Sequence, residues 1–327
     1  MPSSPPRARF RPRRHAQSSH PREREARARA GRGCDSAGHR GRPCPVPVAS
    51  PILSAGCRPC LGDRVSHDVT WSGIRQTSTH TAQRSFLIRR PSGTVPGTVW
   101  TPVRRPGPVP TVLLGHGGSG HRHSDRIVSM AAQFTSAGYA AAAIDGPYHG
   151  ERLRSPLTPA EYQAQIAAEG IGQVLDRIAD DWVTTSNLLA EADVADGTRL
   201  AYFGLSMGTR FGLATAVALG PALRCAVFGK FGLRSAAALN PALHAPDRAL
   251  RDASRITAPV LFHLQWEDDL FPRAGQLDLF DAFAGAEKEL HAFTGRHGHT
   301  PRHAPGLWQS FITRHLAPPR RGQSTSL

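Results

Sequence analysis

Residues 200–208, Leu-Ala-Tyr-Phe-Gly-Leu-Ser-Met-Gly, decide the fold of this chain. Four mostly apolar residues are typical of a buried strand, and they run into a Gly-x-Ser-x-Gly turn. Residues 209–219 have helical texture and are followed by Gly220-Pro221, a pair that ends a helix. The pattern predicts a strand, a sharp turn and a helix, with Ser206 strained at the turn and glycines where the two backbones nearly touch. An ordinary turn with an incidental serine is the alternative interpretation.

The positive charge of the chain is concentrated at its N-terminus. The 327 residues carry 40 Lys and Arg against 25 Asp and Glu, a net charge of +15, and residues 1–64 hold +10 of it through 14 arginines and 4 acidic residues. Residues 1–66 have too few apolar side chains to offset the entropy of ordering, so we expect a disordered segment there and a flexible tail at 319–327. Only one aromatic residue, Phe10, is interleaved with the arginines. A degenerate targeting segment, or sequence upstream of the true start, is therefore favoured over a nucleic-acid arm, and no specific nucleic-acid partner is predicted.

The cysteines and the lengths of the apolar runs bear on three features of the protein: metal sites, disulfides and membrane spans. Cys34, Cys44, Cys57 and Cys60 lie in the arginine-rich segment, and only Cys225 lies in the part expected to fold. Residues 57–60 form a CxxC, but the spacing of the four cysteines matches no usual ligand pattern, so neither a metal site nor a disulfide framework is predicted. The sequence contains no run of about 18 apolar residues and no convincing secretion signal, so we predict no membrane span and a cytoplasmic location.

From His67 onward the sequence alternates between strand and helix patterns. Expected strands cover residues 69–71, 85–88, 93–100 (interrupted at Pro96-Gly97), 110–114, 139–144, 200–203, 225–228, 259–264 and 288–293. Expected helices cover residues 125–136, 159–168, 176–192, 209–219, 273–283 and 304–315, and the stretch after residue 228 receives no assignment. This alternation indicates a mostly parallel central sheet with helices on both faces, in a domain of residues 67–318. Residues 151–196 are expected to supply a covering helix and a small helical lid.

The loops after two later strands hold the partners that a nucleophilic serine needs. A serine hydroxyl becomes reactive when a neighbouring base takes its proton, and that base needs a carboxylate to orient it. Residues 265–272 contain Glu267, Asp268 and Asp269, and residues 294–301 contain His297 and His299. These loops follow predicted strands, so they are candidates for the same edge of the sheet as the serine. Ordinary polar loops are the alternative interpretation.

The chain resembles the α/β-hydrolase superfamily, particularly its dienelactone-hydrolase-like and esterase-like or acyl-peptidase-like members. The likeness covers roughly residues 67–318 and rests on five motifs, Gly115–Gly120, Asp145–Gly150, Gly204–Gly208, Asp268–Pro272 and Gly295–His297. It implies an α/β-hydrolase fold and a serine hydrolase in which Ser, Asp and His follow one another along the chain. Dienelactone hydrolases proper use a cysteine nucleophile, so Ser206 argues against that particular substrate.

The resemblance also selects among the candidate acids and bases. It implies Asp268 as the acid, because the acid sits early in such a loop, with Asp269 as the fallback and Glu267 as a solvated neighbour. It implies His297 as the base, because the base follows a glycine-containing turn. His299 stays open as the base, since only geometry decides between the two histidines.

The same likeness extends to the groups around the reacting carbonyl. The backbone N–H of Met207, at the start of the helix, is expected to bind the oxyanion, helped by the helix dipole. The resemblance implies Gly118 as the second donor. Four further histidines lie in these loops: His116 and His149 are expected to brace them, and His121 and His123 to face solvent.

Two other classes of function fit parts of the sequence. Gly115–Gly120 also matches a dinucleotide-binding G-x-G-x-x-G, with Asp145 as the ribose-binding acid of an NAD(P)-dependent oxidoreductase. That interpretation leaves the serine, aspartate and histidine loops unexplained, and several strands precede the glycine loop. A binding protein on a hydrolase fold with an inactive site is the third candidate.

We therefore predict a serine hydrolase that cleaves carboxylic esters, and less readily amides or peptides, through an acyl-enzyme. This chemistry requires no metal and no cofactor. The expected partner is a small ester or acyl substrate, whose identity depends on the pocket under residues 151–196 and 231–255.

Overall fold

Residues 68–105 and 107–317 are described by the computed structural model, and all of them belong to a unit that spans Asp63–Leu327. The predictions for residues 1–66 with their four cysteines, and for the 319–327 tail, lie outside the described residues. Across the described ranges, every helix is too short or too polar to cross a membrane.

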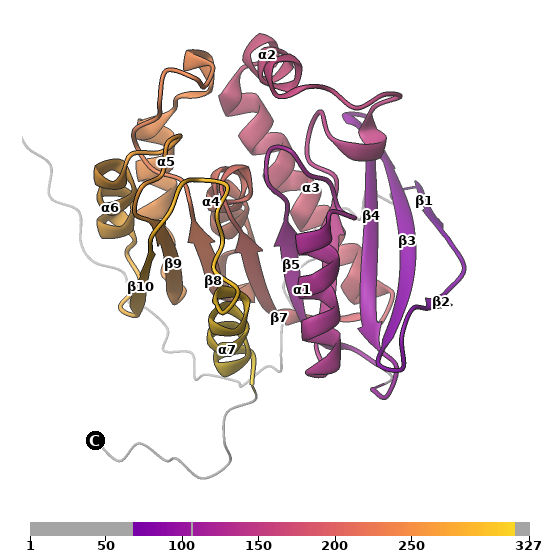
Figure 1. The fold of residues 1–327 in the computed structure, drawn as a ribbon. Helices are drawn as coiled ribbons and strands as arrows, with labels where there is room; N and C mark the ends of the chain where they lie inside the picture. Colours follow the sequence, from indigo (N-terminus) through magenta and orange to yellow (C-terminus); the bar gives the residue numbers. More distant parts are fainter. Residues whose placement is uncertain (1–67, 106, 318–327) are drawn as a thin grey trace, which may run out of the picture. The chain divides into compact units, whose positions relative to one another are not determined.

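Ten strands form one sheet in the order β1-β3-β4-β6-β5-β7-β8-β9-β10, with β2 paired to β3 (Figure 1). The neighbours from β6 through β10 are parallel, whereas the pairs β1/β3, β2/β3, β3/β4 and β4/β6 are antiparallel. The strands are β1 (Asp68–Trp71), β2 (Arg75–Gln76), β3 (Thr81–Arg90), β4 (Gly93–Pro102), β5 (Val109–Gly115), β6 (Ala140–Ile144), β7 (Ala195–Gly204), β8 (Leu223–Gly229), β9 (Val260–Gln265) and β10 (Lys288–Phe293). Parallel strands end at the same edge, so the loops after β5 through β10 meet there.

Helices cover both faces of this sheet, as the alternating pattern predicts. Helices α1 (Asp125–Ser136) and α7 (Ala304–Leu316) lie in front of the sheet in Figure 1 and bury one apolar cluster that includes Phe134 and Trp308. Helices α3 (Ile171–Glu191), α4 (Met207–Leu219), α5 (Pro246–Ala253) and α6 (Arg273–Ala282) bury a second cluster on the other face. Helix α2 (Pro159–Glu169) lies beyond the strand ends, at the top of Figure 1. The short 3₁₀ helices are η1 (Gly150–Arg152), η2 (Gly220–Ala222) and η3 (Pro241–Leu243).

The predicted break at Pro96-Gly97 is wrong, because β4 runs through both residues. The carbonyl oxygen of Pro96 accepts the Asp145 N–H at 3.0 Å, and register with β6 begins one residue later, at Gly97. Pro96 has no N–H to donate, but it lies at the end of the β4/β6 pairing. The pairing therefore loses only its last hydrogen bond. Gly97 lies under the ring of Phe86, which occupies the space that a Cβ would need. The pair is thus accommodated inside a continuous strand.

Other differences concern the lengths of elements and one missed helix. Strand β3 extends the expected 85–88 on both sides, to Thr81–Arg90, and α3 begins at Ile171, five residues before the predicted start. The stretch without assignment contains η3 and α5. Helix α5 has only eight residues, too few for a clear periodic signal, and begins at Pro246.

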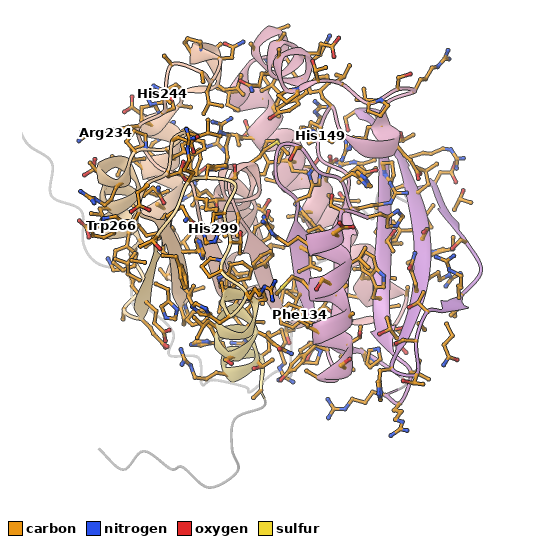
Figure 2. The ribbon with its side chains drawn as sticks, viewed as in Figure 1. Phe134, His149, Arg234, His244, Trp266 and His299 are labelled. Carbon is orange, nitrogen blue, oxygen red and sulfur yellow. The ribbon has the colours of Figure 1, made fainter. Side chains whose placement is uncertain are left out.

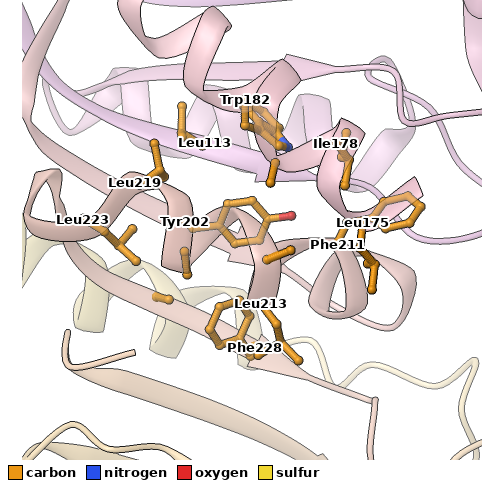
Figure 3. Packing of buried hydrophobic residues seen from close by; sticks show 14 of the residues in the cluster. Leu113, Leu175, Ile178, Trp182, Tyr202, Phe211, Leu213, Leu219, Leu223 and Phe228 are labelled. Atoms are coloured by element: carbon orange, nitrogen blue, oxygen red, sulfur yellow. The ribbon is translucent and has the colours of Figure 1, made fainter. Parts of the chain in front are cut away.

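Tyr202 of β7 contacts both α3 and α4 next to the serine turn (Figure 3). Its ring lies between Trp182 of α3 and Phe228 of β8, with centroid distances of 6.1 and 5.8 Å. Its hydroxyl donates a hydrogen bond of 2.9 Å to the carbonyl oxygen of Gly208, in the first turn of α4. The buried aromatic ring therefore anchors the beginning of the helix that carries the serine turn.

The two glycines of Gly-x-Ser-x-Gly are required by close backbone contacts. A Cβ on Gly204 would lie 2.5 Å from the carbonyl oxygen of Gly208, and one on Gly208 would lie 2.7 Å from the carbonyl oxygen of Gly115. These separations are too short for any side chain. The turn therefore brings β5, β7 and α4 into contact directly below Ser206.

Candidate active site

Ser206 occupies the sharp turn between β7 and α4. Its backbone has φ 59° and ψ −119°, a conformation that non-glycine residues rarely adopt. The Ser206 N–H donates to the carbonyl oxygen of Gly229 at 2.9 Å, which fixes the turn to the end of β8. Thr209 reinforces this link, because its hydroxyl is 2.8 Å from the carbonyl oxygens of Gly204 and Gly229. The strained turn is thus held by neighbouring elements, and it leaves the Ser206 side chain partly exposed.

Asp268 and His297 meet Ser206 at this edge of the sheet. The Nε2 atom of His297 is 2.9 Å from Ser206 Oγ, and its Nδ1 atom is 2.9 Å from Asp268 Oδ2. The carboxylate accepts from Nδ1–H, which leaves Nε2 with the lone pair that can accept the serine proton. The Asp268 side chain is fully buried and that of His297 is 17% exposed. The three predicted residues are therefore in one hydrogen-bonded chain.

Backbone N–H groups of the same loop also hold the Asp268 carboxylate. Its Oδ1 atom accepts the N–H groups of Leu270 and Phe271, at 2.9 and 2.8 Å. Both carboxylate oxygens also lie within hydrogen-bond distance of His297 Nδ1, with Oδ2 at 2.9 Å and Oδ1 at 3.1 Å. Phe271 also packs on the His297 ring, with centroids 5.7 Å apart.

The alternate base, His299, and the alternate acid, Asp269, lie outside the hydrogen-bonded chain of Ser206, His297 and Asp268. His299 is exposed, and its Nδ1 atom is 3.2 Å from the carbonyl oxygen of Thr294 rather than near Ser206. Asp269 is exposed, accepts the backbone N–H of His297 at 3.0 Å and pairs with Arg296 at 3.1 Å. The hydrogen bond from the His297 N–H is the main reason why the pKa of Asp269 is lowered. Asp269 thus contacts the backbone of the histidine loop and not the imidazole.

Gly118 and Met207, the residues expected to bind the oxyanion, lie side by side. Met207 is the first residue of α4, where backbone N–H groups have no partner within the helix. A Cβ on Gly118 would lie 3.9 Å from the Cβ of Met207 and would overlap the hydroxyl of Tyr162 in α2. Gly118 therefore lies close both to the Tyr162 hydroxyl and to Met207, the residue that follows Ser206.

His116 and His149 join the loop after β5 to the loop after β6. The Nε2 atom of His116 accepts the Gly146 N–H at 2.8 Å, and its Nδ1 atom lies 2.9 Å from the carbonyl oxygen of Gly117. His149 places Nε2 2.9 Å from the carbonyl oxygen of Gly118. The two imidazole rings are 5.1 Å apart. Both histidines therefore support the loop that contains Gly118.

The prediction that His123 faces solvent is wrong, although His121 is exposed. His123 is half-buried, and its Nε2 atom is 2.8 Å from Thr98 Oγ1. The hydroxyl of Thr98 is fully buried in β4 and needs such a partner.

Asp145 is fully buried, and three groups already donate to its carboxylate. These are the N–H groups of Arg122 and Glu151, at 2.9 and 2.8 Å, and the guanidinium of Arg122. A ribose-binding acid would have to present its carboxylate to a ligand. The geometry of Asp145 therefore does not favour a dinucleotide site. Within the described ranges, no three His, Cys, Asp or Glu side chains converge as metal ligands would.

Sequence reasoning missed two cations near the site, of which Lys230 is buried and Arg210 half-buried. Lys230, at the end of β8, is only 2% exposed. Its ammonium donates to the carbonyl oxygens of His297 (2.9 Å) and His299 and to Thr300 Oγ1 (2.9 Å), so it holds the histidine loop. Burial lowers the pKa of Lys230 to about 8. Neither its position after the apolar run of β8 nor its residue type signals this role in the sequence.

Arg210, one helical turn after Ser206, is the other cation. Its guanidinium lies over the ring of Phe231, 5.2 Å from the centroid, and burial lowers its pKa to about 10. The i, i+4 spacing from the serine is the only feature in the sequence that could have suggested its proximity.

The burial of His116 predicts that the free energy of unfolding falls at acid pH. Burial, and then the neighbouring His149, lower the pKa of His116 from 6.5 to about 4. The unfolded chain therefore binds more protons, so this stability is complete above pH 6.5 and is lost as the pH falls toward 4. We expect His116 alone to lower the free energy of unfolding by about 2 kcal/mol between pH 7.5 and pH 5. Urea unfolding at the two pH values measures the change.

The His116→Gln variant should lose less stability over the same pH interval than the unmodified protein. The exposed His80 offers the matched control, and His80→Gln should leave the pH dependence as it is. Equal losses in the protein and in His116→Gln would show that His116 does not cause the acid sensitivity.

Comparisons with known proteins identify a family and a shared fold. The model of the dienelactone hydrolase family matches residues 95–310. A solved structure of a cold-adapted esterase from an Arctic intertidal metagenomic library is 27% identical, with a TM-score of 0.64, over 75% of this chain and 99% of that chain. Acetyl xylan esterases from Paenibacillus sp. R4 (19% identity, TM-score 0.57, 76% and 89% covered) and Thermoanaerobacterium sp. (15%, 0.59, 77% and 89%) share the fold. A search of curated proteins found no match.

Proposed function

This chain belongs to the dienelactone hydrolase family and is a carboxylesterase-like hydrolase, and we propose that it cleaves carboxylic esters through an acyl-enzyme formed on Ser206. The single observation that carries the proposal is the chain of hydrogen bonds from Asp268 through His297 to Ser206, with both links at 2.9 Å. Such an arrangement activates a serine toward a carbonyl carbon. The order Ser, Asp, His along the chain also matches that of serine hydrolases with a strand–turn–helix nucleophile.

The proposed reaction has two halves. Ser206 Oγ attacks the ester carbonyl while His297 Nε2 takes its proton, and the same imidazole then protonates the departing alcohol. Water next attacks the acyl carbonyl carbon while giving a proton to His297. The bond to Ser206 Oγ then breaks, the carboxylic acid leaves, and the imidazole returns the proton to Ser206. Asp268 keeps the imidazole in the required tautomer and stabilises its protonated form in both halves.

In this proposal the backbone N–H groups of Gly118 and Met207 bind the oxyanion. Their side-by-side position next to Ser206 supports the assignment. At the start of α4 the helix dipole adds to the stabilisation of negative charge. His116 contributes by holding the carbonyl oxygen of Gly117, which shares a peptide plane with the Gly118 N–H, so that this plane is fixed before the substrate binds.

The proposal also includes a lid over the site and a cytoplasmic location for the protein. We assign residues 153–169, which include α2, as a lid over the strand ends, because Tyr162 of this segment lies against Gly118. Helix α3 is the covering helix, since it packs on α4 and β7. A cytoplasmic location stays a prediction.

Labelling with a fluorophosphonate tests the nucleophile directly. The reagent should phosphonylate Ser206 and abolish hydrolysis of p-nitrophenyl butyrate in proportion to the labelled fraction, because the reagent needs a serine activated by a base. Peptide mass spectrometry locates the adduct. Labelling at another serine, or full turnover of a stoichiometrically labelled protein, would exclude Ser206 as the nucleophile.

A further inference from the structure

Free space around the candidate site is unevenly distributed. A cavity of about 270 Å³ opens beside Gly118, between the loops after β5 and β6 and the lid segment. On the other side, near Arg210 and Phe231, two cavities each hold about 10 Å³, which is room for a single water molecule. Only the first can receive a substrate group without rearrangement. We call it the lid pocket; its walls include Gly118, Tyr148, His149, Leu153, Leu157 and Tyr162.

The lid pocket is built for an apolar group. Leu153 and Leu157 are half-buried, and both contribute aliphatic side chains to its wall. The rings of Tyr162 and His149 pack 4.5 Å apart and form a second, aromatic wall. His149 is the residue labelled on the α2 side in Figure 2, and burial lowers its pKa, so this wall carries no charge at neutral pH.

The order of strands determines which half of an ester reaches this pocket. His297 must protonate the leaving alcohol, and it belongs to the loop after β10, on the β8 to β10 side of Ser206. Gly118 and the lid pocket belong to the loops after β5 and β6, on the opposite side of β7. In Figure 2, His299 of the histidine loop and His149 of the pocket are accordingly well separated. The alcohol therefore departs toward His297, and the acyl group extends toward the lid pocket.

We propose that the lid pocket is the acyl-binding site and that the substrates are esters of medium-length apolar or aryl carboxylic acids. This inference rests on the proposed esterase function. A cavity of about 150 Å³ is enough for benzene, so 270 Å³ accommodates an acyl group of roughly six to ten carbons. An acetyl group leaves most of the pocket unfilled and gains little from it.

A series of p-nitrophenyl esters from acetate to dodecanoate tests the proposal. Burial of each methylene contributes at most about a fourfold increase in kcat/KM, so we expect hexanoate to exceed acetate by about tenfold or more. The value should then fall beyond decanoate, when the pocket is full. A flat series, or a maximum at acetate, would overturn the assignment.

Variants at Leu157 give the sharper test, because they change the volume of the pocket in opposite directions. In Leu157→Trp the ratio of kcat/KM for hexanoate to that for acetate should fall about tenfold, and in Leu157→Ala the optimum should move to a longer chain. Leu250→Trp, on the exposed surface of α5, is the control and should keep both the ratio and the optimum. An unchanged ratio in Leu157→Trp would contradict the proposal.

A second substrate series separates the acyl group from the alcohol. For acetate esters of progressively larger alcohols, kcat/KM should change with the size of the alcohol in the same way in the unmodified protein and in Leu157→Trp, because the alcohol lies on the His297 side. If Leu157→Trp instead discriminates among alcohols, the lid pocket binds the alcohol and the assignment to the acyl group is wrong. Absence of turnover with every ester would refute the esterase function itself, which keeps the two failures distinct.

Discussion

Replacing Ser206 by alanine should reduce kcat for p-nitrophenyl hexanoate by a factor of about 10⁴ to 10⁶. The substitution removes the atom that attacks the carbonyl carbon, and no other hydroxyl is hydrogen-bonded to His297 within the described ranges. Alanine keeps a Cβ at a position whose φ is 59° in any case, and the anchoring bond from the backbone N–H of residue 206 to Gly229 is retained. The thermal midpoint should therefore change little. Single-turnover kinetics and thermal denaturation measure the two effects.

Ser254→Ala is the matched control for this experiment. Ser254 is exposed at the end of α5, and its hydroxyl bonds only to the carbonyl oxygen of Arg251. Its loss should leave ester turnover unchanged. If Ser206→Ala retained turnover within tenfold of the unmodified protein, Ser206 could not be the nucleophile.

Replacing Asp268 by asparagine should reduce kcat by about 10³ to 10⁴. The backbone N–H groups of Leu270 and Phe271 donate to Oδ1, so the amide oxygen of asparagine would remain on that side. Its NH₂ group would then replace Oδ2 and face His297 Nδ1. Because Nδ1 lies nearer to this NH₂ group (2.9 Å) than to the amide oxygen (3.1 Å), the imidazole would accept there and carry its proton on Nε2, where it can no longer take the proton of Ser206.

Asp269→Asn is the comparison that separates the two neighbouring acids. Asp269 accepts the backbone N–H of His297, and an amide oxygen can do the same. We expect kcat to fall by less than about tenfold, and KM to stay within about twofold in both variants, since neither acid is expected to contact substrate. A larger loss in Asp269→Asn than in Asp268→Asn would reverse the assignment of the acid.

Patterns within short stretches were enough to predict most of the fold. Residues 125–136 and 288–293 are delimited correctly as α1 and β10, because the spacing of apolar side chains and a glycine after the helix act over a few neighbours. Pro96-Gly97 was misjudged for the opposite reason. Whether a proline interrupts a strand depends on the partner that would have received its N–H, and that partner, β6, is more than forty residues away.

The two histidines of the loop after β10 show that a sequence pattern cannot decide which of two neighbouring side chains reaches Ser206. His297 and His299 are two residues apart in sequence, yet only His297 lies beside Ser206, while His299 bonds to Thr294. Their separation depends on Lys230, whose buried ammonium holds the carbonyl oxygens of both residues. No local signal in the histidine loop indicates a lysine from β8.

The sequence by itself determined that this chain forms a parallel-centred α/β sheet with a strained serine between a strand and a helix. That information is local, since the spacing of glycines and apolar residues decides how a strand, a turn and a helix follow one another. Only the tertiary structure decided which aspartate and which histidine meet Ser206, and where the space for a substrate lies. Both outcomes depend on contacts between loops that the sheet brings together from distant parts of the chain, and such contacts leave no periodicity in the sequence.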